Sequence, residues 1–210
     1  MVWGSYGEEL DRLIAQRDGE NVIFILRRAA VPIYLYIILF LAWLAWFSAF
    51  LFRKRASGAR QIKKQARWGI LLEGVGFALV WQGRFWGHEP GWKLVPALVF
   101  LIGAPILSWT GVAALGRHWR IDAGLNPDHQ LVRSGPYSIV RHPIYASMLC
   151  MLLGTGLILT PWLLFLAAIL IFLVGTEIRV RIEDGLLASQ FGEDFTAYKH
   201  KVRAYIPWLR

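Results

Sequence analysis

Apolar and polar segments alternate along this chain, and the longest apolar segments contain no charged residue. Residues 31–52 and 94–116 are runs of 22 and 23 residues without a charge. A weaker segment, 68–83, is apolar except for Glu73. Because a helix needs about 20 apolar residues to cross the hydrocarbon core of a bilayer, these segments predict membrane-spanning helices.

The apolar run 143–176 is too long for a single span. It has 34 residues without a charge. As one helix it would measure about 51 Å at ~1.5 Å per residue, against a hydrocarbon core of about 30 Å. The dipeptide Thr160-Pro161 lies at its middle, and a proline inside a helix breaks it. The sequence therefore predicts two helices, 143–160 and 161–176, joined by a tight turn, which makes five membrane helices.

The composition agrees with an all-α polytopic membrane protein of one domain. Of 210 residues, 56% are hydrophobic and 11 are tryptophan. Residues 1–30 contain charges that interrupt any signal-peptide core, and the spacing of Leu10, Leu13 and Ile14 predicts a short amphipathic helix. Residues 177–210 form the predicted tail. The single cysteine excludes an intrachain disulfide and a cysteine-cluster metal site.

The distribution of Lys and Arg predicts the orientation of the helices. Residues 53–67 hold seven, residues 117–141 hold four, and the tail after residue 176 holds six. These 17 lie on one side of a five-helix arrangement and the remaining 6 on the other. The positive-inside rule then places the N-terminus outside and the helical tail in the cytoplasm. Basic residues interleaved with aromatics on one soluble face, as nucleic-acid binding requires, are absent.

Residues 133–145 form a polar, turn-rich segment that leads directly into the fourth predicted helix. A Gly-Pro dipeptide near its start is a turn signal, and Pro143 suits the first turn of a helix. Arg133 and Arg141 add positive charge to a helix N-terminus that is already electropositive. This combination predicts binding of an anion such as a carboxylate or a phosphate.

The fifth helix is expected to continue beyond residue 176 as the tail. Arg179 and Glu183 are spaced i and i+4, so they share one helix face and can pair. Two interpretations stay open: a surface ion pair where the helix leaves the membrane, or a pair that orients a substrate in a cavity. Gly192 predicts a bend in this tail, and Gly185 predicts a local break.

Glu73 is an acid inside an apolar segment. Such a residue is by default a candidate for function, whereas pairing with Arg67 or Lys64 would give it a structural role instead. The polar segment 133–145 offers three further candidates for function, each with a structural alternative. For His142 the alternative is capping of the helix, and for Tyr137 and Tyr145 it is anchoring at the membrane interface.

An ordered set of motifs from residue 115 onward carries a family resemblance. The set comprises 128–137, 141–145, Arg179, Glu183, Asp184, Leu187, Phe191, Gly192 and the final Ile206-Pro207. It resembles the isoprenylcysteine carboxyl methyltransferase family, within a wider group that includes phospholipid methyltransferases. The first two predicted helices carry no signature of the family. The family often has two glutamates where this chain has a glutamate followed by Asp184.

The resemblance implies S-adenosylmethionine as methyl donor, bound in a pocket that faces the cytoplasm. It implies a lipid-like or prenylated acceptor, with a carboxylate as the favoured methylated group. By motif position, Arg179 would lie near the acceptor and act in catalysis with Glu183. The implied cofactor contacts are His129, Leu131, Val132, Tyr137, His142, Pro143, Tyr145 and Glu183.

The chemistry of such a transfer asks mainly for alignment, because the sulfonium donor is activated by its own charge. A carboxylate acceptor needs no general base, and Arg179 could hold it through its fork of donors. An ammonium acceptor would need a base, for which His142 or Glu183 are candidates. The alternatives are a phospholipid N-methyltransferase, a small-thiol methyltransferase, an NADPH-dependent membrane enzyme of the sterol-reductase type, and a non-catalytic membrane scaffold.

Overall fold

The computed structural model describes residues 31–51, 61–62, 65–82, 91–116, 124–125 and 130–207. Within these ranges the long elements are all helices: α2 (Ile33–Leu51), α3 (Ala66–Gln82), α4 (Leu94–Leu115), α5 (Pro143–Leu159) and α6 (Trp162–Lys201). Two residues each of β1 (Gln61–Ile62) and β2 (Gly124–Leu125) pair antiparallel. The predicted all-α class is confirmed, and a helix lies at each of the five segments where one was expected. The predicted amphipathic segment 1–30 and His129 lie outside the described residues.

The outward surfaces of these helices are apolar. In the described ranges, three stretches are long and apolar enough to cross a membrane: Ile33–Leu51, Gly91–Leu115 and Trp162–Lys201, while α5 is a shorter apolar helix. Exposed side chains include Phe40 and Leu44 of α2 and Ile102 of α4. An apolar surface of this extent is unfavourable in water and suits a hydrocarbon environment. The protein is therefore a polytopic integral membrane protein.

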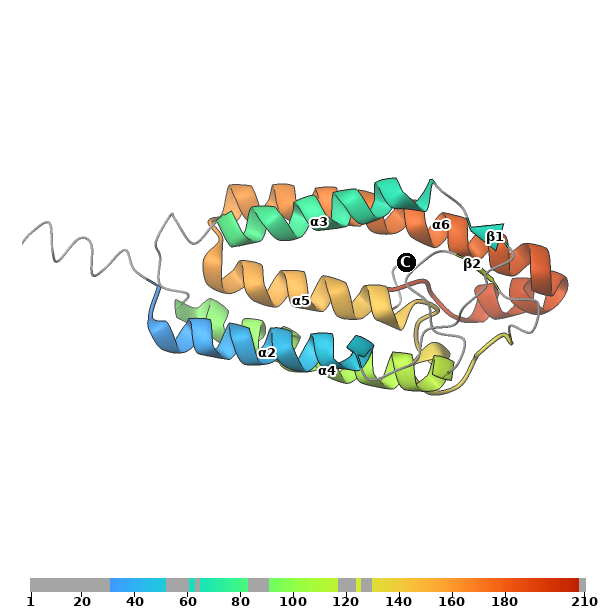
Figure 1. The fold of residues 1–210 in the computed structure, drawn as a ribbon, viewed down its shortest axis with the longest axis horizontal. Coiled ribbons are helices and arrows are strands. Elements are labelled where there is room, and N and C mark those ends of the chain that lie inside the picture. The colour runs from blue at the N-terminus through green and yellow to red at the C-terminus, as the bar shows by residue number, and fades with distance from the viewer. Residues whose placement is uncertain are drawn as a thin grey trace, which may run out of the picture.

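The helices run roughly side by side, with α3 along α6, α2 along α4, and α5 between the two pairs (Figure 1). Glycines allow α3 to approach α6 closely, as small residues do in membrane proteins. A Cβ on Gly76 would lie 2.9 Å from Cβ of Phe172, and one on Gly175 would lie 2.7 Å from the carbonyl oxygen of Gly69. A Cβ on Gly74, by contrast, would meet nothing within 4 Å.

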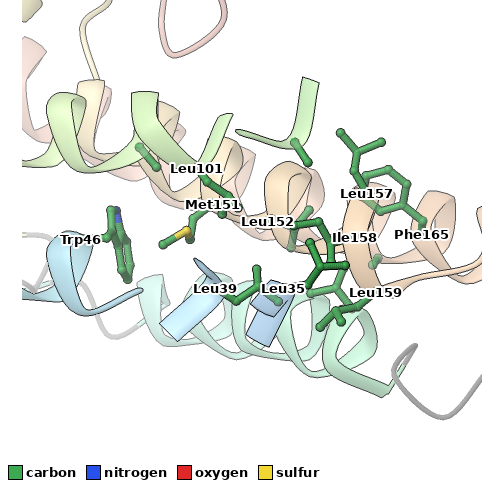
Figure 2. Packing of buried hydrophobic residues seen from close by; sticks show 14 of the residues in the cluster. Leu35, Leu39, Trp46, Leu101, Met151, Leu152, Leu157, Ile158, Leu159 and Phe165 are labelled. Carbon is green, nitrogen blue, oxygen red and sulfur yellow. The ribbon is translucent and has the colours of Figure 1, made fainter. Parts of the chain in front are cut away.

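The apolar core fills the half of the bundle farther from the α6 tail. Figure 2 shows Leu35 and Leu39 of α2 facing Leu152 and Ile158 of α5. All four are fully buried or nearly so. Burying such side chains away from water or loosely packed lipid fixes α5 in the middle of the bundle. Because α5 is fixed along this core, its first residue, Pro143, is also held in place at the end of the bundle near the α6 tail.

The break between the last two helices occurs at Thr160-Pro161, as predicted, because both residues are extended and α6 begins at Trp162. α6 then continues for 40 residues, which confirms the predicted extension. Gly192 has φ of 51° and bends the helix, also as predicted. The predicted break at Gly185 is wrong. A helical glycine costs only about 1 kcal/mol, and burial of the neighbouring Asp184 and Leu186 in the folded protein holds the helix there.

Candidate active site

The loop that precedes α5 is paired with the segment that follows α6. The backbone N–H of Arg141 donates to the carbonyl of Arg203, and the N–H of His142 donates to the carbonyl of Ala204, both at 2.7 Å. Main-chain pairing of this kind satisfies buried polar groups that no helix serves. It brings the start of α5 and the end of the tail together, although about sixty residues separate them in the sequence.

The positive charge at this helix N-terminus is neutralised by the chain itself. Nη2 of Arg141 lies 2.8 Å from Oδ2 of Asp184, with both side chains buried. The same guanidinium donates to the carbonyl of Val202. Arg133 pairs with Asp194 at 3.1 Å on the surface. The anion expected near these arginines is thus an internal carboxylate in each case.

His142 lies between two carboxylates of α6. Its Nε2 is 3.0 Å from Oδ1 of Asp184, and its Nδ1 is 3.4 Å from Oε2 of Glu183. Although it occupies the N-cap position of α5, its side chain makes no capping bond. Lys199 also reaches Asp184, at 3.2 Å. We call Arg141, His142, Asp184 and Lys199 the Asp184 cluster.

These contacts change the acidities of the three central groups. Burial lowers the pKa of His142, but its bonds to Asp184 and Glu183 raise it, and the net shift is upward. Burial raises the pKa of Glu183, yet the bond to His142 and the charges of His142 and Arg179 lower it overall. The pKa of Asp184 is likewise lowered, because the bonds and charges of His142 and Arg141 outweigh burial. The geometry therefore favours a protonated imidazole between two ionised carboxylates.

Tyr145 connects this group to Arg179. The Tyr145 hydroxyl donates to the carboxylate of Glu183, and the ring centroid of Tyr145 lies 4.7 Å from Cζ of Arg179. A guanidinium at that distance over an aromatic ring is attracted by it. The structure thus brings together four residues that the sequence nominated: His142, Tyr145, Arg179 and Glu183.

The ion pair expected between Arg179 and Glu183 on one helix face is not how Arg179 is held. Its Nη1 lies 2.7 Å from Oε2 of Glu73 on α3, and both side chains are largely buried. Oγ1 of Thr176 donates to Oε1 of Glu73 at 3.1 Å. The surface ion pair is therefore wrong, because the close packing of α3 on α6 places a carboxylate from another helix beside the guanidinium.

The partners suggested for Glu73 from the sequence also differ from those found. Lys64 lies outside the described residues, whereas Arg179 and Thr176 of α6 are the groups that bind the carboxylate. The sequence did indicate that Glu73 has a partner, because a buried acid in an apolar helix is usually paired with a cation. Its identity could not be read from the sequence, because the two residues are 106 positions apart.

The remaining residues nominated for the cofactor surround this group less directly. Tyr137 is buried in the 3-10 turn η4 (Gly135–Ser138), and its carbonyl accepts a bond from the hydroxyl of Tyr198. Burial and the charge of Glu183 raise the pKa of Tyr137. Pro143 is buried at the first position of α5. Leu131 and Val132 are half-buried in the irregular segment before η4. Because Tyr137 and Tyr145 are buried, they are not anchors at the membrane interface.

A family model matches the part of the chain that contains most of this site. Residues 97–189 match the model of the isoprenylcysteine carboxyl methyltransferase family. The matched region begins after α3, so it includes Arg179 and Glu183 but not Glu73. The resemblance inferred from the motifs is confirmed.

Curated relatives with two kinds of name match part of this chain. The chain is 35% identical over 84 residues to protein-S-isoprenylcysteine O-methyltransferase of Schizosaccharomyces pombe, covering 40% of this chain and 36% of that protein. It is 34% identical over 99 residues to the cobalt-zinc-cadmium resistance protein CzcN of Cupriavidus metallidurans, covering 47% and 45%. It is 29% identical over 143 residues to the nickel-cobalt-cadmium resistance protein NccN of Alcaligenes xylosoxydans xylosoxydans, covering 68% and 63%. The chain thus spans about a third to under two-thirds of these relatives.

Proposed function

We propose that this chain is an integral membrane methyltransferase, because residues 97–189 match the model of the isoprenylcysteine carboxyl methyltransferase family. It transfers a methyl group from S-adenosylmethionine to a lipid-like or prenylated acceptor, with a carboxylate as the methylated group. The observation that carries the proposal is the convergence of His142, Tyr145, Arg179 and Glu183 at the charged end of an apolar bundle. Relatives named protein-S-isoprenylcysteine O-methyltransferase support the same acceptor class.

The residues present fit a cationic methyl donor. Glu183 stays ionised because its pKa is lowered overall, and its side chain is the more accessible of the two carboxylates that contact His142, at 25% against 5% for Asp184. An accessible carboxylate beside buried Tyr137 and Tyr145 suits a ligand that carries positive charge and a flat ring. When bound, S-adenosylmethionine supplies an electrophilic methyl group. Glu183 would bind the positively charged donor, and Tyr145 and His142 hold Glu183 in place.

We assign to Arg179 the role of orienting the acceptor. Its guanidinium lies at the point where α6 passes from its apolar part to its charged part, so a carboxylate at the end of a lipid chain would meet it at this depth. A carboxylate acceptor needs no general base. His142 is held between two carboxylates as a cation, which makes it a poor proton acceptor. The arrangement therefore favours a carboxylate over an ammonium acceptor.

An apolar groove also runs along α6, on a face that does not carry Arg179 or Glu183. Its volume is about 510 Å³, and its walls are Leu170, Leu173, Val174, Glu177, Ile178, Arg181 and Tyr205. The groove is apolar at one end and reaches the Glu177–Arg181 ion pair at the other. Tyr205 also packs in the buried cluster that contains Tyr145.

Ligand binding and turnover of the detergent-solubilised protein test the proposal. S-adenosylhomocysteine at 100 times its dissociation constant should raise the free energy of unfolding by about 2.7 kcal/mol. Methyl transfer should be assayed with a prenylated cysteine analogue, phosphatidylethanolamine and a small thiol, and we expect turnover of the first. Stabilisation by NADPH alone would instead favour the reductase alternative. In sealed vesicles, S-adenosylmethionine added on the side of the tail should support turnover, since we propose that this side is cytoplasmic.

A further inference from the structure

We propose that Glu73 and Gly69 of α3 are positioning residues for Arg179, so that a helix outside the family-matched region sets the geometry of the acceptor site. The inference rests on the proposed function, in which Arg179 holds the acceptor carboxylate. α3 therefore takes part in the reaction through Arg179, without a side chain of its own reaching the acceptor.

Glu73 fixes the direction of the guanidinium. Its Oε2 binds Nη1 of Arg179 at 2.7 Å, while its Oε1 accepts the hydroxyl of Thr176 at 3.1 Å. Both oxygens of the carboxylate are therefore bound, and Glu73 is only 2% exposed. A charged hydrogen bond in a buried place is strong and directional. It limits the rotation of a side chain that would otherwise have many rotamers.

The ring of Tyr145 holds the same guanidinium from α5, with its centroid 4.7 Å from Cζ. Arg179 is therefore positioned by groups from two other helices, the Glu73 carboxylate of α3 and the aromatic ring of α5. Only the second of these lies within the matched residues 97–189. Tyr145 also bonds to Glu183, so the orientation of Arg179 is coupled to the donor side of the site.

Gly69 gives Arg179 the space it occupies. A Cβ at this position would lie 2.4 Å from Cγ and 3.1 Å from Cδ of Arg179, and 2.7 Å from the carbonyl oxygen of Gly175. The backbone of Gly69 is ordinary helix, so the glycine is required for room and not for conformation. An alanine would push the stem of Arg179 away from α3 and move its guanidinium relative to the acceptor.

The decisive experiment compares three variants of α3 by acceptor kinetics and by S-adenosylhomocysteine binding. Gly69→Ala should lower kcat/KM about 100-fold, the effect expected when a reacting group is displaced by about 1 Å. Glu73→Gln keeps the shape and the bond to Thr176 but loses the charge, and should lower kcat/KM about 10-fold or more. The matched control is Gly74→Ala, whose Cβ would meet nothing within 4 Å; it should leave kcat/KM unchanged. All three should bind S-adenosylhomocysteine as the wild type does.

A double variant separates positioning from general support of the fold. If Glu73 acts through Arg179, then Glu73→Gln added to Arg179→Ala should cause no further loss of kcat/KM. Independent, multiplicative losses would overturn the inference. If Gly69→Ala fails to fold, as loss of S-adenosylhomocysteine binding would reveal, the decision rests on Glu73→Gln and this double variant.

The outcomes also separate this inference from the proposed function. Wild-type turnover with unchanged kcat/KM in both Gly69→Ala and Glu73→Gln would refute the inference and leave the methyltransferase proposal standing. No turnover by the wild type with any acceptor would refute the proposed function, and this inference with it.

Discussion

Two groups of buried charges lie on either side of Glu183, and they are built differently. The Glu73–Arg179 pair joins α3 to α6, so both partners come from regular helices. The Asp184 cluster joins α6 to the loop before α5, where main-chain bonds from Arg141 and His142 to the end of the chain add to the ion pairs. The first group aligns two elements that apolar packing already holds together. The second holds two irregular segments, which also pack against each other through the buried Val140, Ala204 and Tyr205.

The two buried carboxylates, Asp184 and Glu73, also differ in the number of their partners. Asp184 has three cationic neighbours, Arg141, His142 and Lys199. Among the residues that the structure describes, Glu73 has one, Arg179, together with the hydroxyl of Thr176. We therefore expect the Asp184 cluster to control folding and donor binding, and the Glu73–Arg179 pair to control turnover.

The largest expected effect comes from breaking the Asp184 cluster. Asp184→Ala would leave Arg141 charged, buried and without its carboxylate, which costs about 3–5 kcal/mol in other proteins. The free energy of unfolding in detergent should fall by that order, and S-adenosylhomocysteine binding should be lost. The control is Asp194→Ala, which removes the surface partner of Arg133 and should cost under about 1 kcal/mol. Equal losses in the two variants would contradict the comparison.

A second expected effect is a loss of stability as the pH rises. The pKa of His142 is raised above its ordinary value of 6.5, so its contribution is fully present below about pH 6.5 and is lost as the pH rises through the folded-state pKa. The loss amounts to about 1.4 kcal/mol for each pH unit that separates the folded-state pKa from the unfolded-state pKa. Thermal unfolding between pH 5 and 9 should show this loss, and His142→Gln should flatten it. Unchanged curves for the variant would assign the dependence to another group.

The acid side has the opposite sign. The lowered pKa values of Glu183 and Asp184 give stability that is present above the ordinary range of carboxylates and is lost as the pH falls toward the folded-state values. The same series, extended below pH 5, should show that second decline in the wild type and a smaller one in His142→Gln, because His142 is the main group that lowers both pKa values.

The smallest effects come from deleting one hydrogen bond at the Glu73–Arg179 pair and one beside the Asp184 cluster. Thr176→Val removes the hydroxyl that donates to Glu73, and Tyr198→Phe removes the hydroxyl that donates to the carbonyl of Tyr137. Each should lower the free energy of unfolding by about 1 kcal/mol. Kinetics and calorimetry should separate them: Thr176→Val should change kcat, and Tyr198→Phe should change the affinity for S-adenosylhomocysteine. The same functional loss in both would show that the two groups do not have separate roles.

The helices could be predicted from the sequence because the bilayer imposes their length and polarity. Uninterrupted apolar runs and the Thr160-Pro161 break locate them to within a few residues. The prediction failed at Gly185 because the local cost of a glycine is small beside the burial of the neighbouring Asp184 and Leu186. Local propensity is decisive only where packing is weak, as at Gly192, where the helix does bend.

The site residues could be nominated but not paired. His142, Tyr145, Arg179 and Glu183 stand out through their motifs, whereas their partners depend on how distant segments pack. Arg141 pairs with Asp184, which is 43 positions away in the sequence. The spacing on one helix face predicted Glu183 as the partner of Arg179, whereas the carboxylate that binds Arg179 belongs to Glu73 of α3. Spacing rules describe neighbours on one helix, so contacts between helices fall outside their reach.

Because α6 is continuous, the position of a residue along it indicates the depth of that residue relative to the membrane. Arg179 and Glu183 are four residues apart on a helix that does not bend until Gly192, so they differ in height by about 6 Å at ~1.5 Å per residue. Tilting or sliding α6 in a thinner or thicker bilayer changes the depth of both groups together and leaves their separation unchanged. The distance between the proposed donor and acceptor residues is therefore a property of the protein. The height at which they meet, relative to the lipid surface, depends on the membrane.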